Sequence, residues 1–106
     1  MPTIVKGFIS KWDRDQHFED HGHDFGGLTS ADEYEAAAVA FFNKPLAGGM
    51  MEGVRLADGW IIRFDSNTDE FAICDVDGYL RTYFKPDPAI HGLPNNTEYF
   101  RRRCRS

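Results

Sequence analysis

Cysteine is scarce in this chain, and its two cysteines show no spacing that indicates a metal site or a redox pair. Cys74 lies in an apolar stretch and Cys104 in a basic one. Zinc sites and redox dithiols usually place cysteines close together in pairs. The sequence therefore excludes a zinc finger and a disulfide-rich scaffold, and it predicts that Cys74 is a small buried side chain. A single disulfide between the two cysteines stays open, without support from the pattern.

Long apolar stretches are also absent. No run approaches the roughly 20 apolar residues of a membrane-spanning helix. The N-terminal stretch MPTIVKGFISKWDRD carries charges where a signal peptide needs apolar residues. We therefore expect no membrane contact, and a protein that is cytoplasmic or is delivered into the cytoplasm of a target cell.

Positive charge is the third scarcity. The chain has 12 Lys and Arg residues against 17 Asp and Glu residues, a net charge of −5. Four of these cations lie at the C-terminal end: Arg101, Arg102, Arg103 and Arg105. The first 100 residues therefore hold only eight. Binding to phosphate depends on Lys and Arg, so any contact with a nucleic acid must come from a local patch.

Apolar residues, by contrast, are plentiful. They make up 42% of the chain, which includes nine Phe residues, and this is enough for one hydrophobic core. The sequence has no internal repeat and no linker, so residues 1–106 are expected to form a single domain with an Arg-rich C-terminal tail, residues 101–106.

Two helices are predicted in the first half of the chain. Ser10 is suited to cap a helix over about Lys11–His21, and Gly22 is suited to end it. The motif SADE at residues 30–33 fits a capping box, and apolar residues then recur at helical spacing as far as Phe42. Both helices precede any clear strand pattern.

Short strands follow in the second half, separated by the turn sequences DG, SNTD and DG. Such short connections join only antiparallel neighbours. We therefore predict an α+β fold in which N-terminal helices pack on a four-stranded antiparallel meander sheet. The expected strands are 50–56, 60–65, 70–75 and 79–84, with a short strand or extended lead-in at 3–9 and a last helix capped by Asn96.

Three histidines, His17, His21 and His23, lie within seven residues, with Asp20 between them and Asp24 directly after them. On a helix the first two share one face. A histidine exchanges protons near neutral pH, which suits a general acid or base. The same pair could also supply two metal ligands, although no third ligand is indicated, or occupy ordinary surface positions.

The predicted last strand carries a second group of candidate residues. Strict alternation places Arg81, Tyr83 and Lys85 on one face and Thr82 on the other, together with Leu80 and Phe84. Arg63 lies in the middle of the second predicted strand. Arg63 and Arg81 are expected either to contact a substrate or to pair with carboxylates on neighbouring strands, such as Asp65 or Asp75.

The segments HFEDHGHDFGGLTSADEYEAAAVAFF and VRLADGWIIRFDSNTDEFAICDVDGYLRTYFKPDP resemble small toxin nuclease domains. These domains form the C-termini of bacterial contact-dependent inhibition proteins and other polymorphic toxins, and they are similar to the barnase, EndoU, colicin and RelE group of ribonuclease folds. The resemblance covers about Gln16 to Pro88. It implies metal-independent cleavage of RNA, commonly tRNA, with no cofactor, and an immunity protein that inhibits the toxin.

The resemblance also implies roles for individual residues. His17 and His21 match the helix histidines, Arg63 matches the basic residue of the second strand, and Thr82 and Lys85 match the motif of the last strand. His23, Arg81 and Tyr83 are expected to contact the substrate. A histidine would take the proton of the ribose 2′-hydroxyl, which then attacks the adjacent phosphate.

Two alternatives remain open from the sequence. The first is a non-catalytic module of the same fold that binds a protein or a nucleic acid with its sheet and its Arg-rich tail. The second is a small metalloprotein built on the histidines. The tail is expected either to be a solvated terminus or to contact phosphate.

Overall fold

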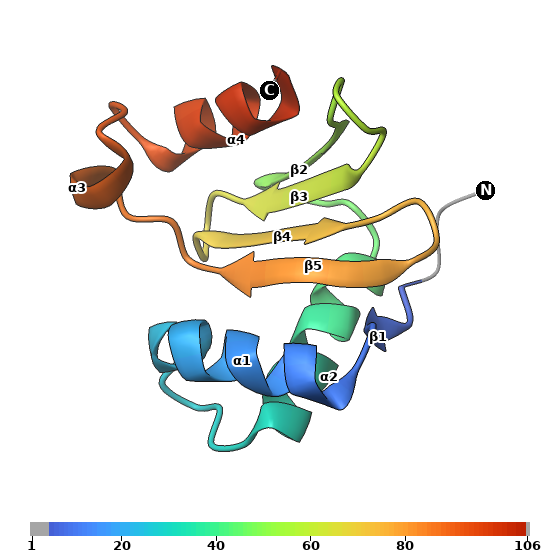
Figure 1. Cartoon of the computed structure of the whole chain (residues 1–106). Coiled ribbons are helices and arrows are strands. Elements are labelled where there is room, and N and C mark those ends of the chain that lie inside the picture. Colours follow the sequence, from blue (N-terminus) through green and yellow to red (C-terminus); the bar gives the residue numbers. More distant parts are fainter. Residues whose placement is uncertain (1–4, 106) are drawn as a thin grey trace.

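A five-stranded mixed sheet lies between two helical layers in the computed structural model, which describes residues 5–105 (Figure 1). Helices α1 and α2 cover one face of the sheet, and α4 covers the other. The elements are β1 (Gly7–Phe8), α1 (Lys11–His21), the 3₁₀ turn η1 (Gly22–Asp24), α2 (Ala31–Asn43), β2 (Met50–Val54), β3 (Ile61–Asp65), β4 (Glu70–Cys74), β5 (Tyr79–Phe84), α3 (Pro88–His91) and α4 (Asn96–Arg105).

The α+β class is confirmed, but the sheet differs from the predicted four-stranded meander. Strands β2 to β5 do pair as antiparallel neighbours in the order of the sequence. A fifth strand, β1, joins the edge of β5 in parallel, with Gly7 opposite Tyr79. This pairing spans most of the chain and involves only two residues, too few to produce an alternating pattern. The predicted strand at 3–9 lies in part outside the described residues.

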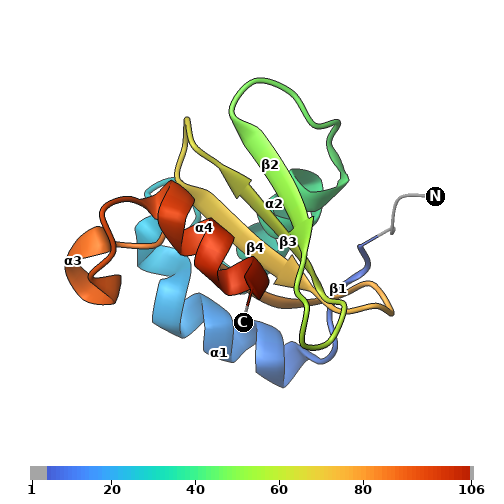
Figure 2. The same ribbon diagram turned by 90° about the horizontal axis from the view of Figure 1, so that it is seen from above.

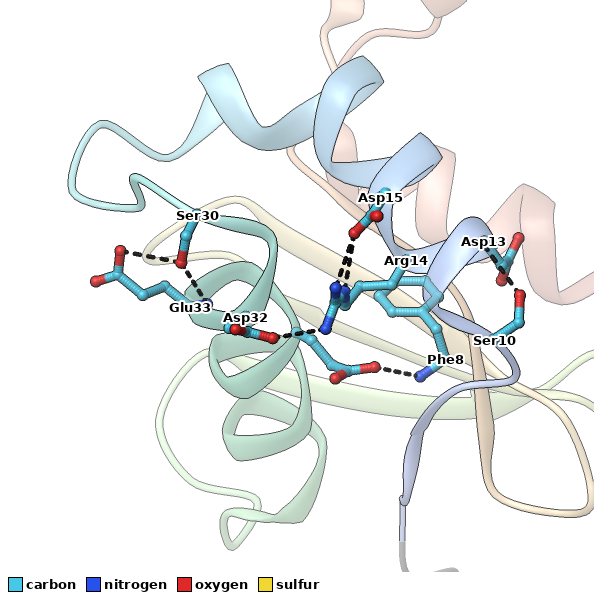
Figure 3. A network of polar contacts seen from close by, with 9 residues as sticks. Phe8, Ser10, Asp13, Arg14, Asp15, Ser30, Asp32 and Glu33 are labelled. Carbon is cyan, nitrogen blue, oxygen red and sulfur yellow. Dashed lines mark hydrogen bonds and ion pairs between the residues drawn. The ribbon is translucent and has the colours of Figure 1, made fainter.

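Helices α1 and α2 begin at the predicted capping residues (Figure 3). The hydroxyl oxygen of Ser10 accepts a hydrogen bond from the Asp13 N–H (3.1 Å), and that of Ser30 accepts one from the Glu33 N–H (3.2 Å). The Arg14 guanidinium bridges the two helices through Asp32 at 2.5 Å. The two helices are thereby held as one layer.

The sheet separates two hydrophobic cores. The core on the α1–α2 face contains Tyr34, Phe41, Cys74, Leu80 and Tyr83, among others. The core under α4 is formed by five buried residues and their neighbours: Ile62, Phe64, Phe71, Ile73 and Phe100. Each face of the sheet is therefore covered by its own helical layer. Figure 2 shows α4 lying across the second of these faces.

The two cysteines belong to different sides of the sheet. Cys74 is buried in the α1–α2 core, as predicted, and Cys104 lies on α4. Both thiols are free, so the open alternative of a disulfide is not realised. Cys104 instead packs closely on β2, where a Cβ added to Gly53 would lie 2.7 Å from the Cys104 sulfur. A side chain at position 53 would therefore force the Cys104 thiol to move.

A β-bulge in β5 contradicts the predicted alternation of that strand. Ile73 pairs with Thr82, but the next residue, Cys74, pairs with Leu80, so Arg81 is an extra residue. The strand pattern shifts by one position at a bulge. Leu80 and Tyr83 therefore enter the same core, and Arg81 and Tyr83 do not share a face. The sequence gives no local glycine to mark the shift.

The last helix extends to the end of the described chain. The arginines of the expected tail are part of α4 up to Arg105. The helix begins one residue earlier than predicted, because Asn95 and not Asn96 is the cap: the Asn95 side chain accepts a hydrogen bond from the Glu98 N–H (2.8 Å). Asn96 is instead buried in a hydrogen-bond network. No helix in residues 5–105 is long and apolar enough to cross a membrane.

Candidate functional site

A pocket of about 420 Å³ opens where the end of α1 and the turn η1 meet the end of β5, α3 and the start of α4. Three of the four histidines of the chain line it, together with three aspartates and one lysine. Phe84 and Tyr99 form part of its apolar wall. The polar lining residues are Asp20, His21, His23, Asp24, Lys85, Asp87 and His91. The pocket thus gathers titratable groups from four separate parts of the chain.

His21 is a half-buried histidine of this pocket. It is the last residue of α1, and its ring lies 5.1 Å from that of Phe84, centroid to centroid. Burial lowers the His21 pKa below its ordinary value, and this outweighs the nearby Asp24, which favours the charged form. Neither ring nitrogen of His21 has a hydrogen-bond partner within residues 5–105. The ring is therefore a neutral base at neutral pH, free to accept a proton.

Lys85 lies just beyond β5 and lines the same pocket as the end of α1. Its backbone N–H donates to Asp24 Oδ2 at 3.2 Å, which ties η1 to the end of the sheet across 61 residues of sequence. The Lys85 ammonium lies 5.3 Å from the centroid of the Phe25 ring. Among the described residues that line the pocket, Lys85 is the only lysine or arginine. It is the cation available to an anionic ligand there.

His91 lines the pocket although sequence reasoning missed it. The Asn96 side-chain nitrogen donates to Pro86 O (2.9 Å), so the Asn96 oxygen faces His91 Nε2, also at 2.9 Å. His91 Nε2 must then carry the proton, while His91 Nδ1 accepts the Leu93 N–H (3.1 Å). Tyr99 stacks on the ring at 4.6 Å. With both nitrogens engaged, His91 shapes the wall and supplies no free base.

The other two predicted histidines lie at different distances from the pocket. His23 is at the rim, with its side chain 76% exposed and its Nε2 3.4 Å from Asp24 Oδ1. His17 is one turn before His21 on α1 and does not line the pocket. It stacks on Phe8 at 5.1 Å, and its buried Nδ1 has no hydrogen-bond partner in the described chain. Their spacing on the helix was predicted, but only His21 and His23 reach the pocket.

Arg63 lies away from the pocket and holds the end of α2. The side chain is buried, with 6% of the residue exposed. Its guanidinium donates to the carbonyl oxygens of Phe41 (3.0 Å) and Lys44 (2.6 Å) and pairs with Glu52 at 3.0 Å. The predicted ion pair across strands therefore exists, but with Glu52 in place of Asp65 or Asp75. Unpaired carbonyls at a helix C-terminus are the groups that such a cation satisfies.

The remaining predicted residues of β5 are also placed outside the pocket. Arg81 pairs with Asp75 at 3.8 Å, as one reading of the sequence predicted, and lies over the Trp60 ring at 4.6 Å. Thr82 is opposite Ile73 in the sheet, on the α4 face. Tyr83 is 1% exposed, and its hydroxyl donates to Glu70. Of the predicted residues in and directly after β5, only Lys85 lines the pocket together with the histidines.

The histidines and carboxylates do not gather into a metal site. Within residues 5–105, no group of three or more His, Cys, Asp or Glu side chains is arranged to hold a metal ion. The pocket instead is lined by a neutral base, His21, and by the ammonium-bearing Lys85, with His23 at the rim.

Comparison with protein-family models and with curated protein sequences finds no match to the chain. The function must therefore be argued from the residues and the geometry of this pocket.

Proposed function

We propose that the protein is a metal-independent endoribonuclease of the toxin type, which cleaves RNA, tRNA among its candidates, in the pocket between α1 and β5. One observation carries the proposal: His21 from α1 and Lys85 from the end of β5 line the same pocket although they are far apart in sequence. A base and a cation facing one cavity are what phosphodiester transesterification requires.

The reaction follows from the protonation states of these groups. Neutral His21 takes the proton from the ribose 2′-hydroxyl, and the 2′-oxygen forms a bond to the adjacent phosphorus. Lys85 stabilises the added negative charge on the phosphate. The bond from phosphorus to the 5′-oxygen then breaks. His23, beside Asp24 at the rim, donates a proton to that leaving oxygen. RNA carries the internal nucleophile and DNA does not.

The negative charge of the pocket limits its affinity for phosphate. Asp20, Asp24 and Asp87 face the same space as the single ammonium of Lys85. Two of these carboxylates are fixed by the fold, because Asp24 accepts the Lys85 N–H and Asp87 accepts the Ala89 N–H. Phosphate is therefore held weakly, and stacking of a base on Phe84 or Tyr99 must contribute most of the binding. The acidic chain is also suited to a basic inhibitor protein.

The proposal is tested by incubating the folded protein with total RNA, once without and once with a metal chelator. We expect fragments that end in a 2′,3′-cyclic phosphate, because the 2′-oxygen is the nucleophile. DNA of matched sequence, which lacks that hydroxyl, should stay intact. Intact RNA after incubation with folded protein would contradict the proposal. Cleavage that disappears with chelator would support the metalloprotein alternative instead.

The cleavage rate should depend on pH through His21. Its pKa lies below the ordinary value of about 6.5. The base is active when neutral, so on the acid side of the profile kcat/KM is expected to fall as the pH drops through the lowered pKa of His21. A pH profile measured on a single oligoribonucleotide checks this. An activity that rises between pH 7 and pH 9 would show that another group is the base.

A second candidate function is binding without catalysis, and α4 favours it. Arg102 and Arg105 are exposed on this helix, and neither has an ion-pair partner within residues 5–105. Such cations suit a polyanion. A folded protein that binds RNA in a salt-dependent manner but leaves it uncut would favour this function over the ribonuclease.

A further inference from the structure

A second groove, of about 370 Å³, lies next to the pocket and shares Lys85 with it. Its other wall is the loop after η1, which carries Phe25, Gly26, Gly27 and Leu28, and its far edge is formed by Glu70 and Tyr83. We propose that this Gly26–Gly27 groove is a second nucleotide subsite, so that the scissile phosphate lies at Lys85 with one nucleoside in the pocket and its neighbour in the groove. The inference rests on the proposed ribonuclease function.

The first support is that the fold does not require glycine at either position. A Cβ added to Gly26 or Gly27 would meet no atom within 4 Å, and neither residue has a positive φ. Gly22 is the contrast, since a Cβ there would lie 2.6 Å from the Phe18 ring. Two consecutive glycines lower stability where the backbone does not need them. Their missing side chains instead leave space for a ligand to approach the backbone closely.

The second support is the set of groups that face this space. The N–H groups of Gly26 and Gly27 donate to no other residue in the described part of the chain, so both remain available to a ligand. Together with the Lys85 ammonium they are donors suited to phosphate and ribose oxygens. The Glu70 carboxylate accepts the Thr68 hydroxyl (2.8 Å) and the Tyr83 hydroxyl, and within residues 5–105 it forms no ion pair with Lys85.

The third support is a stacked aromatic surface in the groove, next to Lys85. Phe25 stacks on buried Tyr83, with ring centroids 4.4 Å apart and planes inclined by 13°. The Lys85 ammonium lies over the same Phe25 ring. Lys85 is thereby held at the boundary, where it can reach a phosphate that joins a nucleoside on each side. A single-stranded RNA fits this arrangement, because its bases are free to turn into two separate cavities.

The test is a series of increasing volume at one position: Gly27→Ala, Gly27→Val and Gly27→Leu. An occupied groove predicts that KM for a short mixed-sequence oligoribonucleotide rises with side-chain volume, by about tenfold or more at leucine, comparable to the loss of one stacked base. The thermal midpoint should stay close to that of the wild type, because the added atoms point into open space. An unchanged KM in folded Gly27→Leu would overturn the subsite.

The alanine variant separates this role from that of a flexible hinge. A hinge predicts that Gly27→Ala already produces the full effect, mainly in kcat, and that larger side chains add nothing. That result would also overturn the subsite. A subsite predicts that the alanine variant shows the smallest rise in KM of the series, since one methyl group fills the least of the groove.

A binding measurement distinguishes failure of the subsite from failure of the proposed function. Affinity for the same fluorescently labelled oligoribonucleotide is measured with His21→Ala and with His21→Ala combined with Gly27→Leu. RNA that is cleaved by the wild type, with equal affinities in these two variants, leaves the function standing and removes the subsite. RNA that is bound but never cleaved, with weaker binding by the double variant, removes the function and leaves the subsite as a binding groove.

Discussion

Replacing His21 by glutamine or alanine is expected to reduce RNA cleavage by roughly 10²- to 10⁴-fold, the range that a positioned general base contributes. The reason is specific to this histidine. Its ring lines the pocket, both nitrogens lack a hydrogen-bond partner in the described chain, and burial keeps it neutral by lowering its pKa. The loss should appear in kcat, because the aromatic walls that bind the substrate are unchanged. Single-turnover cleavage of a defined oligoribonucleotide measures it.

His17→Gln is the matched control, since His17 lies one turn earlier on the same helix but does not line the pocket. The sequence predicts the same catalytic role for both histidines. The structure predicts instead that His17→Gln changes the cleavage rate by only a few fold. Circular dichroism and a thermal melt confirm that both variants are folded. An equal loss of cleavage rate in the two folded variants would show that lining the pocket does not identify the general base. Full activity in folded His21→Gln would remove the proposed mechanism.

Local sequence signals predicted the parts of this fold that depend on neighbours in the chain. The caps at Ser10 and Ser30 and the short turns between strands act over a few residues, and they produced helices α1 and α2 and the β2–β5 meander. Pairings between distant segments were not predictable in the same way. The parallel strand β1 and the bulge at Arg81 depend on contacts across the whole sheet, which no local pattern records.

In the candidate site, too, features set by neighbouring residues were predictable and contacts between distant segments were not. The helical spacing of His17 and His21 was correct, and the motif that ends in Lys85 was recognised as a candidate. Their meeting in one pocket depends on how α1 packs against β5. His91 illustrates the limit, because it reaches the pocket through a loop held by buried Asn96, and no periodicity connects these residues with the first helix. Charge and residue type predicted candidates, and burial decided which of them face the pocket.

Arg63 is the clearest case in which burial changes the expected role. As a cation in the middle of a strand it was a candidate to stabilise phosphate charge. In the structure its guanidinium pairs with Glu52 of β2 and donates to the carbonyls of Phe41 and Lys44 at the end of α2. A substrate would have to compete with these buried partners. Arg63 is therefore expected to stabilise the fold without taking part in cleavage.

Replacing Arg63 by methionine should lower the free energy of unfolding by about 2–4 kcal/mol. The side chain keeps much of its volume, but two carbonyl oxygens lose a charged donor and Glu52 loses its ion-pair partner. The expected loss of unfolding free energy is smaller than the largest losses seen when a fully buried ion pair is broken. The reason is that the Glu52 side chain is 35% exposed and water can solvate it. Chemical denaturation followed by circular dichroism measures the change, and cleavage per folded molecule should stay near that of the wild type.

Arg81→Met provides the control for this prediction. Arg81 has a 43% exposed side chain and a longer pair with Asp75, so its loss should cost less than about 1 kcal/mol. The comparison separates the two roles of a strand arginine because Arg63 and Arg81 carry the same charge in the same sheet. If Arg63→Met were as stable as Arg81→Met but unable to cleave RNA, Arg63 would act on the substrate. The carbonyl oxygens of Phe41 and Lys44 would then have to accept hydrogen bonds from donors other than Arg63.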